Sequence, residues 1–157
     1  MIPSLEELKA ALDRGVPGTA AAIDGGCLVV EPQQLLAVCR FLKGAPDLQL
    51  DYVSNLTAID YPPDRIDAVY HLFSMAKKHG PVPLKVKLPR ANPRVPSLTA
   101  VYRGAEFQER EAYDLYGVIF EGHPDLRRIL MWDEFVGHPM RKDYVPENQD
   151  ETLEDAH

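Results

Sequence analysis

Five prolines fall between Pro81 and Pro96, and this density constrains the fold more than any other feature of the sequence. Proline has no backbone N–H and a fixed φ angle, so it stops helices and weakens pairing in the centre of a sheet. We therefore expect this segment to form an edge strand followed by an extended connector.

Two helices are predicted before the proline-rich segment. Ser4 and Glu7 have the spacing of a capping box, and leucines recur behind them at helical spacing, which predicts a helix over residues 4–14. Pro32 suits the first turn of a helix, and the apolar residues that follow it predict a second helix that ends near Lys43, before Gly44 and Pro46.

Strands are predicted in the part of the chain that precedes and includes the prolines. Residues 19–23 and 27–30 flank Asp24-Gly25-Gly26, a sequence that tolerates the positive φ angles of a tight hairpin. Further strands are expected at residues 48–59, 66–75 and 84–88, each bounded by Pro, Gly or Asp. Helices followed by consecutive strands indicate an α+β fold, in which N-terminal helices pack on a small mixed or antiparallel sheet.

The chain has 157 residues, of which 45% are apolar, and this is enough for one ordinary globular core. We expect a single domain at residues 1–144 and an acidic tail at residues 145–157. A formal charge of -7 disfavours a nucleic-acid binder, and no apolar run has the roughly 18 residues that a membrane-spanning helix needs. We therefore expect neither nucleic-acid binding nor direct insertion into a membrane.

Only Cys27 and Cys39 are present, and their spacing matches neither an iron–sulfur motif nor a structural zinc motif. We therefore expect no cluster on this chain.

A third helix is predicted from Glu106 to about Tyr116, with Gly117 as its left-handed C-cap. Its acidic residues lie beside the face of the helix that is expected to be apolar. Glu106, Arg110 and Asp114 are spaced to pair along one exposed face, but a covered face would need partners from elsewhere, such as the bases at 127–128 and 141–142. We favour the covered network over the solvated ladder.

After this helix, Gly-His-Pro occurs at residues 122–124 and again at 137–139, and each copy is followed by two bases. His123, Asp125 and His138 offer a metal site as an alternative, but histidines in such turns more often bond backbone carbonyls. Catalysis by the acids of the third helix is also disfavoured, because no nucleophile lies near them in sequence.

Residues 109–131 (EREAYDLYGVIFEGHPDLRRILM) resemble the signature of the 30-kDa subunit family, also designated C, of proton-translocating NADH-quinone oxidoreductase, respiratory complex I. Residues 137–144 (GHPMRKDY) resemble the continuation of that signature, and residues 51–60 resemble the family's upstream strand region. Trp132 and Met140 depart from the family's pattern, where Pro and Leu are expected.

The resemblance implies a non-catalytic structural subunit in the hydrophilic arm of the complex. Its main partner would be the quinone-site subunit, designated D, with the B and I subunits nearby, on the cytoplasmic face of the inner membrane. The complex passes electrons from NADH through FMN and iron–sulfur clusters to quinone and translocates protons. The resemblance implies no cofactor on this chain, with FMN and the clusters on partner subunits.

We expect the docking surface to lie in residues 109–144. The residues expected to carry it are the charged and turn residues of the signature: Glu109, Arg110, Glu111, Asp114, Gly117, Gly122, His123, Pro124, Asp125, Arg127, Arg128, Gly137, His138, Pro139, Arg141, Lys142, Asp143 and Tyr144.

Two alternatives remain open. The chain could be the equivalent subunit of a membrane-bound hydrogenase, a formate hydrogenlyase or a coenzyme F420-dependent dehydrogenase, whose modules are related; neighbouring genes would distinguish these. More remotely, it could be a stand-alone metal-dependent enzyme that uses His123, Asp125 and His138.

Overall fold

The computed structural model describes residues 1–146, and its first helix, α1 (Leu5–Gly15), begins at the predicted capping box. The Ser4 hydroxyl accepts the Glu7 N–H at 3.2 Å, and the Glu7 carboxylate accepts the Ser4 N–H at 2.7 Å. The second predicted helix is also present, as a short 3₁₀ turn (Pro32–Gln34) that continues into α2 (Leu35–Gly44). Local sequence chemistry therefore located both N-terminal helices.

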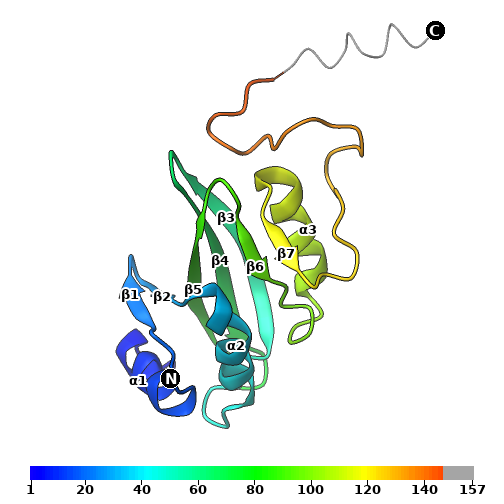
Figure 1. Cartoon of the computed structure of the whole chain (residues 1–157). Helices are drawn as coiled ribbons and strands as arrows, with labels where there is room; N and C mark the ends of the chain where they lie inside the picture. The colour runs from blue at the N-terminus through cyan, green and yellow to red at the C-terminus, as the bar shows by residue number, and fades with distance from the viewer. Residues whose placement is uncertain (147–157) are drawn as a thin grey trace, which may run out of the picture.

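Five strands form the main sheet in the order β1-β2-β5-β4-β3 (Figure 1). The strands are β1 (Ala22–Asp24), β2 (Cys27–Val29), β3 (Tyr52–Tyr61), β4 (Arg65–Ser74) and β5 (His79–Pro89). The pairing of β2 with β5 is parallel and the other pairings are antiparallel, so the sheet is mixed. The predicted hairpin turn lies between β1 and β2, where Gly25 and Gly26 have φ angles of 57° and 74°.

The expectation that the proline-rich segment forms an edge strand is wrong. β5 lies between β2 and β4, and β2 pairs with it only at Leu84 and Lys85. The prolines of β5, among them Pro83, lie outside this two-residue contact, so β2 never requires an N–H from them. A short partner strand therefore allows a proline-bearing strand to occupy an interior position.

The connector after β5 was predicted to be extended, and it also contains a short paired strand. β6 (Arg94–Pro96) pairs in parallel with β7 (Ile119–Glu121) in a second sheet of two strands. The predicted third helix, α3 (Ala105–Tyr116), lies between them in sequence and ends at Gly117, whose φ of 77° is left-handed as expected.

The helices cover one face of the main sheet. Side chains from α1, α2 and α3 join the inward residues of the strands in one buried apolar cluster. On β4, for example, Ile66, Ala68 and Tyr70 point into this cluster, whereas Asp67 and Val69 alternate with them and lie outside it. α3 also covers the edge strand β3, because the Gln108 side chain accepts the Leu56 N–H at 2.7 Å. The predicted α+β architecture is confirmed.

Residues 122–146 follow β7 as a segment without helix or strand, which we call the arm. The arm runs past α3 to the far end of the main sheet (Figure 1). Of the predicted acidic tail, residues 147–157 lie outside the described residues. Within residues 1–146, no helix has both the length and the apolar character needed to cross a membrane.

Candidate docking site

Three charged residues of α3 are buried, and two of them, Arg110 and Asp114, are buried against the arm. Glu109 and Asp114 have no exposed surface and Arg110 is 6% exposed, whereas Glu111 on the same helix is exposed. A buried charge that lacks a partner is strongly destabilising, so each of the three must be bonded by groups outside the helix.

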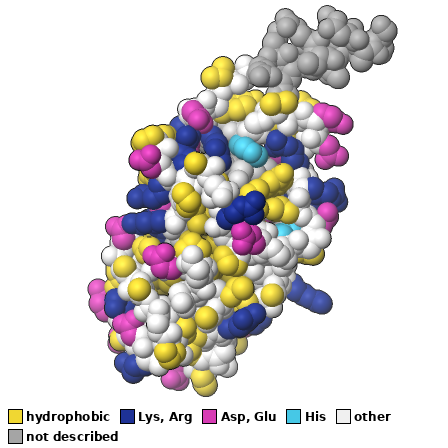
Figure 2. All heavy atoms as spheres, in the orientation of Figure 1, with side chains coloured by type: hydrophobic (Ala, Val, Ile, Leu, Met, Phe, Trp, Pro, Cys, Tyr) yellow, Lys and Arg dark blue, Asp and Glu magenta, His cyan; other side chains and the backbone are white. Residues whose placement is uncertain are grey.

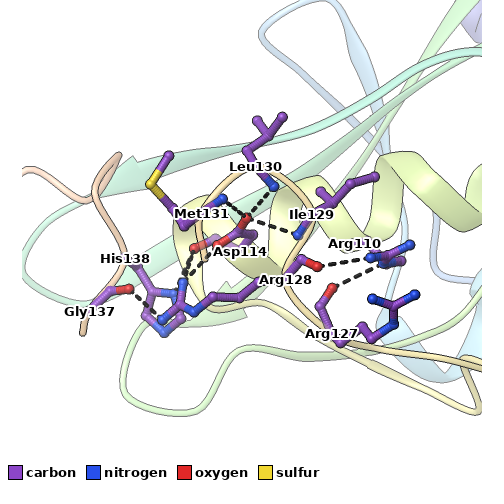
Figure 3. Close-up of polar contacts among 9 residues, drawn as sticks. All are labelled: Arg110, Asp114, Arg127, Arg128, Ile129, Leu130, Met131, Gly137 and His138. Carbon is purple, nitrogen blue, oxygen red and sulfur yellow. Dashed lines mark hydrogen bonds and ion pairs between the residues drawn. The ribbon is translucent and has the colours of Figure 1, made fainter. Parts of the chain in front are cut away.

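Asp114 organises the arm directly (Figure 3). Its Oδ2 accepts the backbone N–H groups of Ile129, Leu130 and Met131 at 3.1, 2.7 and 2.9 Å. Its Oδ1 accepts the Arg128 guanidinium at 2.7 Å. Burial of Asp114 pushes its pKa up, but these four donors together hold the pKa below its ordinary value. A single carboxylate therefore fixes three consecutive residues of an otherwise irregular segment.

The two arginines nearest Asp114 bond backbone carbonyls of the arm (Figure 3). Arg110 donates to the carbonyl oxygens of Arg127 and Arg128 at 3.0 and 2.8 Å. Arg128 donates to the carbonyl of Gly137 at 2.8 Å as well as to Asp114. The predicted covered network is therefore present. The solvated ladder of Glu106, Arg110 and Asp114 is not, because Arg110 turns toward the arm.

The end of the arm is held by a second network, whose centre sequence reasoning missed. Asp60, at the end of β3, accepts two bonds from Arg90 at 2.6 and 2.9 Å and the N–H of Lys142 at 2.8 Å. Arg90 also pairs with Asp143 at 2.8 Å. The Arg90 side-chain bond lowers the pKa of Asp60 despite its burial. Arg141 donates to the Tyr116 carbonyl at 2.7 Å, which ties the same turn to α3.

Glu109 is held differently, in a pocket that has neutral donors. Its carboxylate accepts the Ser97 hydroxyl at 2.7 Å and the Leu98 N–H at 2.6 Å. Burial raises its pKa to about 7, and the two bonds only partly oppose that rise. The His123 Nε2 lies 3.9 Å from the carboxylate.

Both predicted Gly-His-Pro turns place their histidines against α3. The His123 Nδ1 accepts the Asp125 N–H at 2.9 Å, which leaves Nε2 to donate to the Glu106 carbonyl, also at 2.9 Å. The His138 Nδ1 bonds the Asp114 carbonyl at 3.0 Å. This is the backbone role expected for such turns. Among residues 1–146, no group of three His, Cys, Asp or Glu residues is placed to hold a metal ion.

The glycines of the signature serve close packing and turns. A Cβ atom on Gly117 would lie 2.7 Å from the His138 ring and on Gly137 3.1 Å from the Tyr144 ring, and both glycines have positive φ angles. Gly122 also has a positive φ, of 83°. Of the other predicted residues, Pro124 is exposed, Pro139 is half-buried, and Asp125 pairs with Arg127 at 2.9 Å on the surface.

The signature thus turns many of its polar side chains inward, and most of the arm's large apolar side chains are left exposed. Ile129, Leu130, Trp132, Val136, Met140 and Val145 all belong to this exposed set. The sequence pattern predicted the charged residues as docking candidates and did not indicate these apolar ones. Their signal was the density of apolar residues in a segment with no strand or helix periodicity. Such a surface is suited to binding another protein.

The family described as "Respiratory-chain NADH dehydrogenase, 30 Kd subunit" matches residues 28–150. The chain is 51% identical over 123 residues to the C subunit of NADH-quinone oxidoreductase from Moorella thermoacetica, covering 78% of this chain and 81% of that one. It is 48% identical over 117 residues to the C 2 subunit of NADH-quinone oxidoreductase from Rhizobium meliloti, covering 73% of this chain but only 63% of that relative's length.

Two solved structures share the fold. A trypsin-resistant fragment of Nqo5 is 30% identical, with a TM-score of 0.54 over 78% of this chain and 96% of that one. A chain from the membrane-bound sulfane sulfur reductase, an archaeal respiratory membrane complex, gives a TM-score of 0.69 over 96% of this chain and 89% of that one. At 23% identity, the second similarity concerns the fold alone.

Proposed function

We propose, from the premise that this chain belongs to the 30-kDa subunit family of respiratory-chain NADH dehydrogenases, that it is a non-catalytic structural subunit of an NADH-quinone oxidoreductase. In this role the whole chain belongs to the hydrophilic part of the complex, the part outside the membrane. The complex as a whole transfers electrons from NADH through FMN and iron–sulfur clusters to quinone and couples this to proton translocation.

The observation that carries the proposal is that the arm directs bonded polar groups inward and most of its large apolar side chains outward. Two buried charged residues of α3, Asp114 and Arg110, bond the backbone of the arm from inside, while most of the arm's large apolar side chains are exposed. In the isolated chain, the exposed apolar side chains of the arm add no stability, because they are not removed from water. Burial against another protein of the complex supplies that energy.

The proposed main partner is the quinone-site subunit, with the B and I subunits as neighbours, and the chain lies peripherally at the cytoplasmic face of the inner membrane. We place FMN and the iron–sulfur clusters on partner subunits. Cys39 is buried on α2 and Cys27 is half-buried on β2, so neither cysteine belongs to the arm or to its two networks.

A second candidate is the equivalent subunit of a membrane-bound hydrogenase, a formate hydrogenlyase or a coenzyme F420-dependent dehydrogenase. Its support is the shared fold with a chain of the archaeal sulfane sulfur reductase, a respiratory complex with different chemistry. In such a complex the chain would have the same docking role, and the electron donor would differ.

The test is affinity purification of the chain, tagged at its N-terminus, from gently solubilised membranes of its own source, with mass spectrometry of the bound proteins. We expect the quinone-site subunit and the B and I subunits, together with NADH-quinone activity. Recovery of a nickel hydrogenase would favour the second candidate, and a solitary protein would contradict both. Charge reversal at Arg127 and Arg128 should reduce recovery of the quinone-site subunit, and unchanged recovery would count against docking through residues 109–144.

A further inference from the structure

Four apolar side chains form the most exposed part of the arm between its two networks, and we call them the arm face. Leu130, Trp132, Val136 and Met140 are between 53% and 61% exposed. Figure 2 shows hydrophobic side chains on the surface in the upper part of the molecule, where Figure 1 places the arm. Isolated exposed leucines are ordinary, but four large apolar residues within eleven positions of one ordered segment are not.

The backbone that carries the arm face is fixed at several points. Asp114 accepts the Leu130 N–H at 2.7 Å, and the Leu115 carbonyl accepts the Met140 N–H at 3.0 Å. The Trp132 ring meets the Phe135 ring edge-on at 4.9 Å between centroids. A face ordered before binding loses little conformational entropy on docking, so more of the contact energy becomes affinity.

The exposed charge next to Trp132 in the sequence is negative. Asp133 and Glu134 directly follow Trp132 and are exposed, and no ion pair within residues 1–146 includes either of them. Three of the arm's four Arg and Lys side chains are engaged elsewhere, and the fourth, Lys142, is exposed. Arg127 pairs with Asp125, Arg128 with Asp114, and Arg141 with a carbonyl; Lys142 lies 6.0 Å from the Tyr61 ring. A complementary partner therefore carries positive charge next to an apolar groove.

We propose that the arm face is a docking surface that inserts into an apolar groove of a partner protein with a Lys- or Arg-rich rim. Trp132 is the anchor of this contact, because large aromatic side chains at the centre of an interface carry most of its energy. Asp133 and Glu134 face the basic rim, and Asp114 and Arg128 are positioning residues. This inference rests on the proposed function and assigns the contact to apolar side chains rather than to the signature's charges.

The chain has a single tryptophan, which allows the anchor to be observed directly. The full chain is labelled with 5-fluorotryptophan and titrated with the unlabelled quinone-site subunit from the same source, while fluorine NMR follows its one resonance. We expect this resonance to shift, and binding to weaken at least about 30-fold in Trp132→Ala. Met140→Ala should weaken binding about fivefold, while its control Met75→Ala, similarly exposed on the β4–β5 hairpin, should bind within about twofold of wild type.

Charge is tested in the same titration. Replacing Asp133 and Glu134 with Lys should weaken binding about tenfold at low salt, with the difference shrinking at high salt. An unchanged affinity in this double variant would contradict the basic rim.

Three outcomes separate the inference from the proposed function. If the quinone-site subunit binds without moving the resonance, and with equal affinity for Trp132→Ala, the arm face is overturned but the scaffold role stays intact. Failure of wild type to bind this partner contradicts both. A resonance that shifts with phosphatidylcholine vesicles and not with the protein partner makes the arm face a lipid contact and overturns the inference.

Discussion

The central strands β3, β4 and β5 and the arm are both ordered, but they distribute polar and apolar groups in opposite ways. In the strands, apolar side chains such as Leu84 and Ile66 point inward, and backbone pairing satisfies the N–H and C=O groups. In the arm, side chains of α3 and β3 satisfy backbone groups from inside, and most of the large apolar side chains are exposed. The strands are stabilised by burial within the chain, whereas the arm's apolar surface is left for a partner.

The largest expected effect comes from removing the carboxylate that orders the arm. Asp114→Ala removes the carboxylate partner of the buried Arg128 guanidinium and leaves three backbone N–H groups without an acceptor, so the free energy of unfolding should fall by about 3–5 kcal/mol. Urea denaturation measures this. The control is Asp13→Ala, which breaks an exposed pair with Lys9 and should change it by no more than about 1 kcal/mol. Equal values for the two variants would show that the arm does not depend on Asp114.

The same substitution in the two regions sharpens the comparison. Leu84 in β5 has no exposed surface, so Leu84→Ala should lower the free energy of unfolding by about 2–5 kcal/mol by leaving a cavity. Leu130 in the arm is 57% exposed, so Leu130→Ala should change it by less than about 0.5 kcal/mol. Denaturation of both variants under one set of conditions gives the answer. A loss above about 2 kcal/mol for Leu130→Ala would mean that the arm has an apolar core of its own.

The two kinds of buried carboxylate predict opposite pH dependences. Glu109 has a pKa of about 7 in the folded chain and an ordinary value of 4.5, so the folded state binds the extra proton between these values. Stability from this group is therefore full below pH 4.5 and falls by roughly 3 kcal/mol as pH rises through 7. Asp60 and Asp114 have lowered pKa values, so their contribution is present above their ordinary value of 3.8 and is lost as pH falls below it.

Unfolding free energies of wild type and Glu109→Gln between pH 4 and 8 isolate the first of these contributions. Glutamine keeps an acceptor for Leu98 and a donor for Ser97, so the variant should show a flatter profile above pH 5. Parallel profiles for the two proteins would place the pKa of Glu109 near its ordinary value.

A small effect is also expected for a charged residue on the surface of the arm. Arg127 pairs with Asp125 at 2.9 Å, and both side chains are at least half exposed. Arg127→Glu alone should change the free energy of unfolding by less than about 1 kcal/mol, in contrast to Arg128→Glu, which opposes the buried Asp114. Thermal or urea denaturation distinguishes the two. A large loss in Arg127→Glu would show that surface charge, and not the inner network, holds the arm.

Local chemistry in the sequence predicted much of the fold. The Ser4 capping box, the Gly25-Gly26 turn and the Gly117 C-cap act within a few residues, so their outcome was visible without tertiary information. The interior position of β5 was not, because it depends on how short β2 is and where it pairs.

The candidate site divides in the same way. The burial of Asp114 and its pairing with a base such as Arg128 were predictable, because the acidic residues of the third helix lie beside its expected apolar face and buried charges need partners. The second network did not follow, because Asp60 lies 30 residues from Arg90 and 82 from Lys142 in sequence. The outward direction of Leu130 and Trp132 was also hidden, because it depends on which backbone groups α3 holds.

Amide hydrogen exchange of the isolated chain, resolved by residue, tests the central claim most directly. The N–H groups of Ile129, Leu130 and Met131 bond to Asp114, so we expect them to exchange slowly in wild type and much faster in Asp114→Asn, where β4 and β5 stay protected. Rapid exchange at these three residues in wild type, equal to that in Asp114→Asn, would contradict an arm that is ordered from inside before it meets a partner.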